Sequence, residues 1–427
     1  MRSGQPPRAR RARTRVGLLL VLLAVLAACG SGVALGIRAS DAQGESCPET
    51  VMSTLASVLG RVYREGVSSE RTLSAEHMIE RSPGLRRAIE AGDPKAAAAA
   101  IRSLIATGHM TNVQITTTAG RRLADVGGEA LAPLKGTIRG ASGHPIATYL
   151  ASVWSARGFV AEGNGVAEGL VALRAGGRSI GGSLDLPAGS LPPEGTLTRR
   201  GVVYQYDSLP GQVYPAGGPV RIYVLKTVAA TEALCGAATE DTQVNTLQRI
   251  ANLIYQGETG PRTLVQVHRV QRDPALLRAV AARDPAAVKK ASEVLLHHHL
   301  VRLRVSAGGK LLYDLGGPYV LGPVHANLRL HGRTIGNIVI SIQDDEGYLR
   351  LTRRLVGLSV LMYMRGDGGR MQLVKNSLGP GVGGLGSVPA SGSYAYKGKR
   401  YRVFTVDAEA FPSGPLTIRV LVPVPYS

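Results

Sequence analysis

The chain carries the same sequence pattern twice, and this doubling constrains its architecture more than any single motif. Arg71-Thr72-Leu73 returns as Arg262-Thr263-Leu264, 191 positions later (71 to 262). Other pairs at similar offsets are Gly66 and Gly257, Asp93-Pro94 and Asp284-Pro285, Asp125 and Asp314, and Gly158-Phe159 and Gly347-Tyr348. Solenoid repeats span about 20–50 residues. A repeat of this length is therefore a duplicated domain.

The length and composition agree with two globular domains. A chain of 427 residues is expected to form two or three domains, and the duplication selects two, at residues 38–230 and 231–427. Each is long enough to bury its own core. A hydrophobic content of 44% is typical of globular proteins.

The first 37 residues are predicted to be a leader or an anchor. Arginines precede an apolar run that begins at Val16, and Leu26-Ala27-Ala28-Cys29 lies within that run. This tetrapeptide resembles the lipobox of bacterial lipoproteins, which implies cleavage before Cys29 and lipidation of its thiol. The alternative is an uncleaved anchor from Val16 to Ile37, long enough to cross a bilayer. Both readings place residues 38–427 outside the cytoplasm, tethered to the membrane.

Net charge and cysteine usage fit that location. The formal charge is +20, and six of the arginines lie among the first fifteen residues, so +14 remains on the rest (20 − 6). A basic fold suits an anionic partner such as a lipid, a wall polymer or a small carboxylate, although a solvated arginine-rich surface is the simpler reading. Cys47 and Cys235 precede the first helix of each copy. A disulfide between them is allowed outside the cytoplasm, and two unpaired thiols are the alternative.

Each copy changes from helical to strand periodicity along its length. Apolar residues follow helical spacing from Val51 to Val62 and from Val244 to Ile254, and Asp-Pro pairs then start a further helix. Alternating strands and short turns follow, from Val113 and from Val301. This order predicts an α+β fold in which each copy has a long N-terminal helix and one central antiparallel sheet.

In this order of helices and strands, the chain resembles a known family, the extracytoplasmic Cache sensor domains, in which a PAS-like sheet follows a long N-terminal helix. The resemblance is carried by Val113–Gly120, by Gly332–Ile342 and by Gly347-Tyr348-Leu349. It implies two tandem Cache-like domains that bind a small-molecule ligand. One departure is that the chain ends at Ser427 with neither a second apolar span nor an output module. A sensor of this kind is expected to act through a membrane kinase or transporter partner.

The same resemblance implies a ligand pocket between each sheet and its helices. Aromatic side chains would shape the pocket and arginines would bind a carboxylate. The candidates are Trp154, Arg174, Tyr204 and Tyr206 in the first copy, and Tyr348, Arg365 and Tyr401 in the second. Core aromatics and surface arginines are the plain alternative for each.

Motifs for catalysis and phosphate binding fail on local context. Gly177–Gly181 matches the G-x-S-x-G elbow around Ser179, but that elbow needs a following helix and prolines follow instead. Gly381, Gly383 and Gly386 match G-x-G-x-x-G, but a flexible loop follows them.

Metal sites are equally weakly indicated. His297–His299 are adjacent on a helix and point about 100° apart, so they cannot share one ion. Asp344-Asp345-Glu346 suits the first turn of a helix. We therefore expect no metal, no cofactor and no catalytic residue.

Three functions remain open. The first is a non-enzymatic, membrane-anchored extracytoplasmic sensor that binds a small molecule. The second is an envelope scaffold whose PAS-like pockets are filled by side chains. The third is a serine hydrolase centred on Ser179. Nucleic-acid binding is disfavoured, because the chain is expected outside the cytoplasm and has no basic aromatic stripe.

Overall fold

The first half of the chain begins with four helices that are set by local capping. The computed structural model describes residues 45–426 apart from 188, 190, 216–217, 258–259, 297–299, 318–319, 366–368 and 412–413. The predicted leader with Cys29, and His297–His299, lie outside the described residues. The helices are α2 (Cys47–Ser68), α3 (Glu70–Arg81), α4 (Pro83–Glu90) and α5 (Pro94–Ala106). Asp93 caps α5 as the sequence predicts, and Ser69 caps α3; each side chain accepts a backbone N–H of the first turn.

Helices α3, α4 and α5 cover one face of a four-stranded antiparallel sheet. Its strands are β1 (Asn112–Thr117), β2 (Arg122–Val126), β4 (Leu134–Arg139) and β5 (Pro145–Ser152), in the order β2-β1-β5-β4. Buried residues of the helices, such as Ile79, Leu85 and Ile101, form one cluster with Val113 and Ile115 of β1. The sheet therefore has its own small core.

A second sheet completes the first half. Its strands are β3 (Ala130–Leu131), β6 (Trp154–Ser155), β7 (Leu170–Ala175), β8 (Arg178–Gly182), β9 (Gly195–Arg199), β10 (Val202–Tyr214) and β11 (Pro219–Thr227). The order is β6-β3-β10-β11-β7-β8. In addition, β9 pairs with the first residues of β10, Val202–Tyr206. Helix α6 (Ala156–Ala167) contacts this sheet between β6 and β7. Long antiparallel pairing, such as that of β10 with β11, gives it a continuous ladder.

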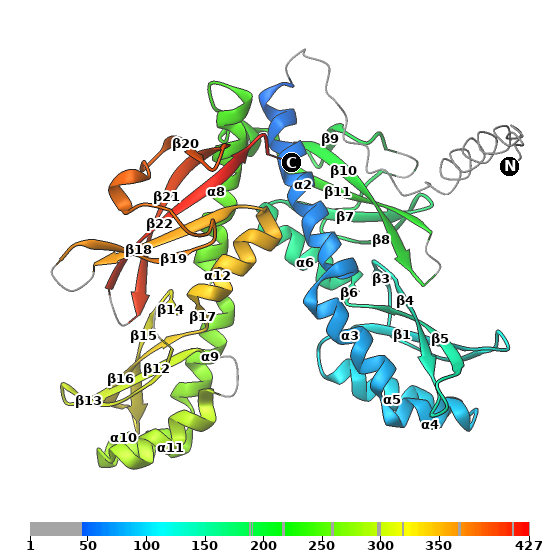
Figure 1. Ribbon diagram of the computed structural model, residues 1–427, viewed down its shortest axis with the longest axis horizontal. Helices are drawn as coiled ribbons and strands as arrows, with labels where there is room; N and C mark the ends of the chain where they lie inside the picture. The colour runs from blue at the N-terminus through cyan, green and yellow to red at the C-terminus, as the bar shows by residue number, and fades with distance from the viewer. Residues whose placement is uncertain are drawn as a thin grey trace, which may run out of the picture. The chain divides into compact units, whose positions relative to one another are not determined.

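The second half repeats this arrangement strand for strand (Figure 1). Its helices are α8 (Thr239–Gly257), α9 (Pro261–Gln271), α10 (Pro274–Ala282), α11 (Pro285–Leu296) and α12 (Asp345–Leu351), and the short α7 (Val228–Glu232) leads into it. A four-stranded sheet holds β12 (Arg302–Ala307), β13 (Lys310–Gly316), β15 (Val324–Leu330) and β16 (Arg333–Ser341). A seven-stranded sheet holds β14 (Val320–Leu321), β17 (Gln343–Asp344), β18 (Ser359–Arg365), β19 (Met371–Asn376), β20 (Gly392–Tyr396), β21 (Lys399–Phe411) and β22 (Gly414–Val424).

The predicted α+β class with antiparallel sheets and long first helices is confirmed, but each half holds two sheets where the sequence indicated one. The two-residue strands β3 and β14 explain the difference. Each leaves the four-stranded sheet and pairs with the end of a long strand more than 80 residues downstream, Leu131 with Val213 and Leu321 with Ala410. Strands of two residues carry no periodicity, so sequence patterns cannot reveal them.

The largest core is shared between the halves. Leu59 and Val62 of α2 belong to the same buried cluster as Leu247 and Ile250 of α8. Both seven-stranded sheets turn their helix-side residues, such as Val224 and Val420, into this cluster. The two copies are therefore joined by continuous apolar packing.

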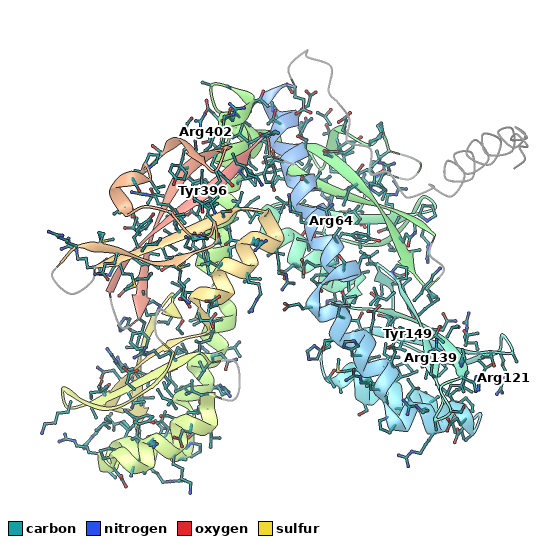
Figure 2. The ribbon with its side chains drawn as sticks, in the orientation of Figure 1. Arg64, Arg121, Arg139, Tyr149, Tyr396 and Arg402 are labelled. Atoms are coloured by element: carbon teal, nitrogen blue, oxygen red, sulfur yellow. A yellow bond between two sulfur atoms is a disulfide. The ribbon has the colours of Figure 1, made fainter. Side chains whose placement is uncertain are left out.

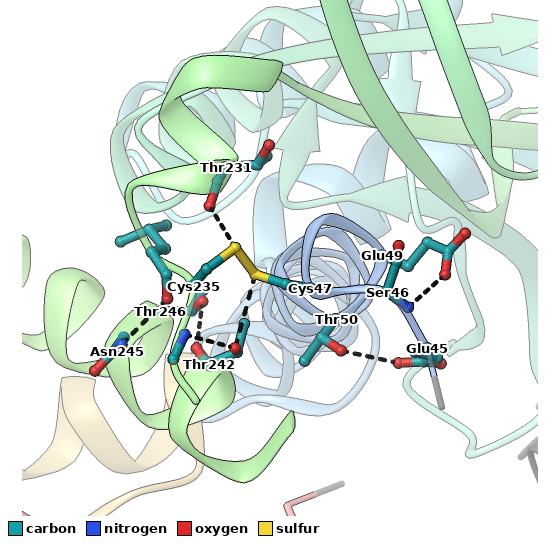
Figure 3. Close-up of a disulfide and its surroundings, with 12 residues drawn as sticks. Glu45, Ser46, Cys47, Glu49, Thr50, Thr231, Cys235, Thr242, Asn245 and Thr246 are labelled. Carbon is teal, nitrogen blue, oxygen red and sulfur yellow. Dashed lines mark hydrogen bonds between the residues drawn. A yellow bond between two sulfur atoms is a disulfide. The ribbon is translucent and has the colours of Figure 1, made fainter. Parts of the chain in front are cut away.

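A disulfide joins the starts of the two long helices. Cys47 opens α2 and Cys235 lies just before α8, and their sulfur atoms are bonded with the Cα atoms 5.6 Å apart. Figure 3 shows the bond beside Thr231 and Thr242. The Thr231 carbonyl lies 3.8 Å from the Cys235 sulfur, and the Thr242 hydroxyl lies 3.7 Å from the Cys47 sulfur. The bridge thus ties together segments that are 188 residues apart in sequence.

None of the helices in the described part of the chain is both long enough and apolar enough to span a bilayer.

Candidate functional site

A tryptophan that packs against the first long helix marks one cleft of the molecule. Trp154, in β6, donates its indole N–H to the Val62 carbonyl of α2 at 3.2 Å. The ring lies directly over Gly66, where an added Cβ would be 2.4 Å from Trp154 Cδ1. Phe159 of α6 meets the same ring edge-on at 5.9 Å. In the first half, the absence of a side chain at Gly66 therefore leaves room for the Trp154 ring.

Arg71 of α3 covers the tryptophan ring. Its guanidinium carbon lies 5.6 Å from the ring centroid. Nη2 donates to the Gly108 carbonyl at 3.0 Å and Nε to the His109 carbonyl at 3.4 Å. Burial lowers the pKa of Arg71, while the nearby Glu162 carboxylate opposes that shift. The guanidinium is thus held in place at the mouth of the cleft.

The opposite wall comes from the second half of the chain. Arg354, which follows α12, forms an ion pair with Glu65 of α2. The cleft between these walls has a volume of about 520 Å³. Its lining residues are Glu65, Ser69, Arg71, Val153, Trp154, Gly158, Ala161, Glu162, Leu351, Arg354 and Leu355.

The wall from the second half has irregular helical geometry. Residues Thr352–Val356 form a π-helical turn, η1, directly after α12. The corresponding segment of the first half is a regular α-helix, α6. Single π-helical turns are frequent at functional sites, where they redirect side chains. The two copies therefore differ in helix geometry at the place where they face one cleft.

The charges of the cleft define what it can hold. Two guanidinium groups, from Arg71 and Arg354, and two carboxylates, from Glu65 and Glu162, surround an opening that also exposes Trp154 and Leu351. Small-molecule sites have volumes of about 300–1,000 Å³ and combine apolar walls with a few fixed polar groups. This cleft suits a small polar molecule that carries both a cationic and an anionic group.

Of the seven residues predicted to bind a ligand, the structure places only Trp154 in this cleft. Tyr204 and Tyr206 of β10 belong to a cluster on the other face of the sheet, under the loop that precedes β9. Tyr206 is buried and meets Tyr223 edge-on at 5.9 Å. Arg174 of β7 is buried too, and it donates to the carbonyls of Gly177 and Pro187. These three side chains hold loops against the sheet.

The second-copy candidates lie apart from one another. Tyr348 of α12 is fully buried in the shared core and donates to the Ala251 carbonyl at 3.4 Å. Tyr401 of β21 packs with Tyr363 and Val388 on the outer face of its sheet. Arg365 ends β18 and is exposed. Ligand binding by these residues stays a prediction.

Side chains also occupy the space between the first four-stranded sheet and its helices. Tyr149, labelled in Figure 2, comes from β5 and donates to Glu80 of α3 at 3.1 Å. Its ring lies over Gly136 of β4, where an added Cβ would be 2.2 Å from the ring. Burial, together with the Glu80 and Glu76 carboxylates, raises the pKa of Tyr149. This tyrosine fills the position in which a PAS-like pocket was predicted.

The sequence motifs for other chemistries have structural roles. Ser179 lies in β8 and pairs with Arg174 of β7, so no strand–turn–helix elbow forms around it. The glycine-rich segment covers the outer face of the second seven-stranded sheet, and the Gly383 carbonyl accepts the Tyr363 hydroxyl at 3.4 Å. Asp344 caps α12, and Lys375 pairs with the next two acids. Among the described residues no cluster of side chains has the makeup of a metal site.

The sequence matches no protein-family profile and no curated protein. Among solved structures, the periplasmic domain of Vibrio cholerae LuxQ aligns with 40% of this chain and 97% of its own, at 14% identity and a TM-score of 0.28. The ligand-binding domain of the Pseudomonas fluorescens chemoreceptor CtaA, in complex with L-isoleucine, aligns with 42% of this chain and 96% of its own, at 9% identity and 0.24. An extracellular ligand-binding receptor from Desulfohalobium retbaense aligns with 55% and 47%, at 11% identity and 0.23. TM-scores this low carry no argument about function.

Sequence reasoning missed most of the cleft. Gly66 and Arg71 were visible as repeated residues, with counterparts Gly257 and Arg262, but their neighbour Trp154 has Gln343 as its structural counterpart. Glu65 and Arg354 are 289 residues apart and carry no motif. The only signals in the sequence were the repeated glycine, Gly66, and the single tryptophan of the chain, Trp154, and nothing in the sequence placed them side by side.

Proposed function

We propose that this protein is a non-enzymatic sensor or binding protein that holds a small zwitterionic molecule in the cleft between its two halves. The cleft joins Glu65 and Arg71 of the first half to Arg354 of the second, and this arrangement carries the proposal. A ligand that pairs with these groups exchanges the internal ion pair for its own contacts. Ligand binding would thus alter the contacts between the two halves, and a sensor requires such a ligand-dependent change in structure.

The proposal includes a location outside the cytoplasm, at the membrane. A basic, apolar N-terminal segment with a lipobox-like tetrapeptide supports a tether there. The disulfide between Cys47 and Cys235 supports an oxidising compartment. Transmission would then run through a membrane partner.

A second candidate is an envelope scaffold that binds no small molecule. The packed positions of Tyr149 and Tyr348 favour it, because each side chain fills space between a sheet and its helices, where a PAS-like pocket was predicted. The cleft is what separates the two candidates, since a scaffold does not require it to bind anything.

Thermal unfolding in the presence of defined ligands tests the proposal. Amino acids, dicarboxylates and polyamines are added separately at millimolar concentration to the full chain. A ligand that binds the native state alone raises the melting temperature, so we expect amino acids or similar zwitterions to raise it and the other two classes to have less effect.

Variants locate the effect. Glu162→Gln removes a cleft carboxylate and is expected to abolish the shift, while Glu293→Gln, the same change at an exposed position of α11, is the matched control and should keep it. If no class shifts the melting temperature, or if Glu162→Gln responds like the parent protein, the sensor proposal fails and the scaffold reading stands.

A further inference from the structure

The outward face of α3 carries a shallow hollow whose residues fit a second copy of themselves. The helix buries Thr72, Ala75 and Ile79 against the rest of the first half. Its opposite face lines an open hollow of about 490 Å³, formed by Glu70, Leu73, Ser74, His77, Met78 and Arg81. Within this hollow, Leu73 is 53% exposed.

The six lining residues are arranged symmetrically along the helix. They fall into three pairs about one midpoint, which are Glu70 with Arg81, Leu73 with Met78, and Ser74 with His77. A two-fold axis over that midpoint, between Ala75 and Glu76, would therefore bring α3 of one copy antiparallel to α3 of another. Each lining residue then faces another lining residue, as an isologous contact requires.

The facing residues are chemically complementary. Glu70 faces Arg81 of the second copy, and within the described part of the chain neither side chain takes part in an ion pair. Leu73 and Met78 lie about 140° apart around the helix, so Leu73 faces Leu73 of the second copy and Met78 faces Met78, which covers these apolar side chains. The Ser74 hydroxyl faces His77, and the small serine leaves the hollow that a partner side chain enters.

We propose that two copies of this chain associate through α3, antiparallel, with two Glu70–Arg81 ion pairs flanking an apolar centre. The duplication supplies a comparison within the molecule. At the corresponding positions α9 has Pro261 in place of Glu70 and Arg269 in place of Met78. A pair of α9 helices would therefore lack the ion pairs, although α9 also exposes Leu264 and Val265. The charge complementarity belongs to α3.

Sedimentation velocity of the full chain in detergent micelles, over a wide concentration range, tests the proposal. One helix face makes a small contact, and small contacts bind weakly, so we expect a monomer–dimer equilibrium. Glu70→Arg and Arg81→Glu each place like charges together twice per dimer, and each is expected to weaken dimerisation at least about tenfold.

Charge reversal at both positions provides the decisive comparison. Glu70→Arg/Arg81→Glu in one chain restores both ion pairs and should restore the dimer. An equal mixture of the two single variants should form heterodimers, because each contact then joins opposite charges. Arg272→Glu, the matched change at the C-terminal end of α9, should leave dimerisation unchanged. Unaltered melting temperatures verify that the variants are folded.

Four outcomes overturn the proposal. The parent chain sediments as a monomer throughout, or the single variants dimerise as the parent does, or the double reversal fails to recover the dimer. An equal loss in Arg272→Glu also overturns it, since that result assigns the contact to general surface charge.

Discussion

Gly66 is the residue at which packing leaves least freedom. It lies within α2, and the Trp154 ring occupies the place of its absent side chain, 2.4 Å from where a Cβ would lie. The corresponding Gly257 has no described atom within 4 Å of that position. Contact with Trp154 thus requires a glycine at position 66, whereas no contact of the described residues requires one at position 257.

This contrast gives a prediction with its own control. Gly66→Ala is expected to lower the free energy of unfolding by about 1–3 kcal/mol, because the tryptophan must leave its place against α2. Gly257→Ala is expected to change it by less than about 0.5 kcal/mol. Denaturant unfolding of both variants measures the difference, and equal effects would contradict the role assigned to the ring.

Glu168 is the residue whose charge connects the halves most directly. It accepts Arg249 Nε of α8 at 2.8 Å, and this hydrogen bond holds the pKa of Glu168 below its usual value of 4.5. Lys226, whose own pKa burial lowers, lies 3.8 Å from the same carboxylate.

A depressed carboxylate pKa stabilises the folded state above the unfolded-state pKa, and that stabilisation is lost as pH falls through the lower, folded-state value. Glu168→Gln is therefore expected to be less stable than the parent at pH 6. The difference should shrink steadily below about pH 4.5. Melting temperatures measured from pH 3 to 7 test this, and a difference that stays constant with pH would contradict it.

At the scale of elements, the disulfide between the starts of α2 and α8 connects the two copies covalently. It spans 188 residues, and a cross-link of that span restricts the unfolded chain strongly. Cys47→Ala/Cys235→Ala is expected to lower the free energy of unfolding by about 2–5 kcal/mol. Denaturant unfolding measures the change.

Reduction supplies the control for this prediction. A reducing agent should destabilise the parent protein by a similar amount and leave the double variant unchanged. A parent protein whose stability does not respond to reduction would show that the bridge contributes nothing in solution.

At the scale of the whole molecule, the predicted boundary between residues 38–230 and 231–427 crosses a shared core. Leu247 and Ile250 of α8 are almost fully buried in the cluster that holds Leu59 and Val62 of α2. Separating the halves would expose this surface to water at about 25 cal/mol per Å² of apolar area.

We therefore expect fragments 38–230 and 231–427, expressed separately, to bind a hydrophobic dye and to melt at lower temperatures than the full chain. Mixed together, they should associate and recover part of that stability. Calorimetry and size-exclusion chromatography test this. Two monomeric fragments that each melt near the temperature of the full chain would show that the boundary separates independent domains.

The sequence by itself determined the doubling, the α+β class and most element positions. Helix caps such as Asp93 and Asp284 were readable because capping involves residues two or three apart. The hairpins β1–β2 and β12–β13 were readable because side-chain alternation repeats every two residues. All of these signals arise from interactions within short segments.

The tertiary structure decided the number of sheets, the shared core and the candidate site. Pairing of Leu131 with Val213, and of Glu65 with Arg354, depends on where distant segments lie once the chain has folded. The same holds for Tyr206 and Tyr401, whose aromatic character predicted a pocket but whose strand faces place them under loops. Long-range contacts leave no periodic trace in a sequence, so the cleft between the halves became visible only in three dimensions.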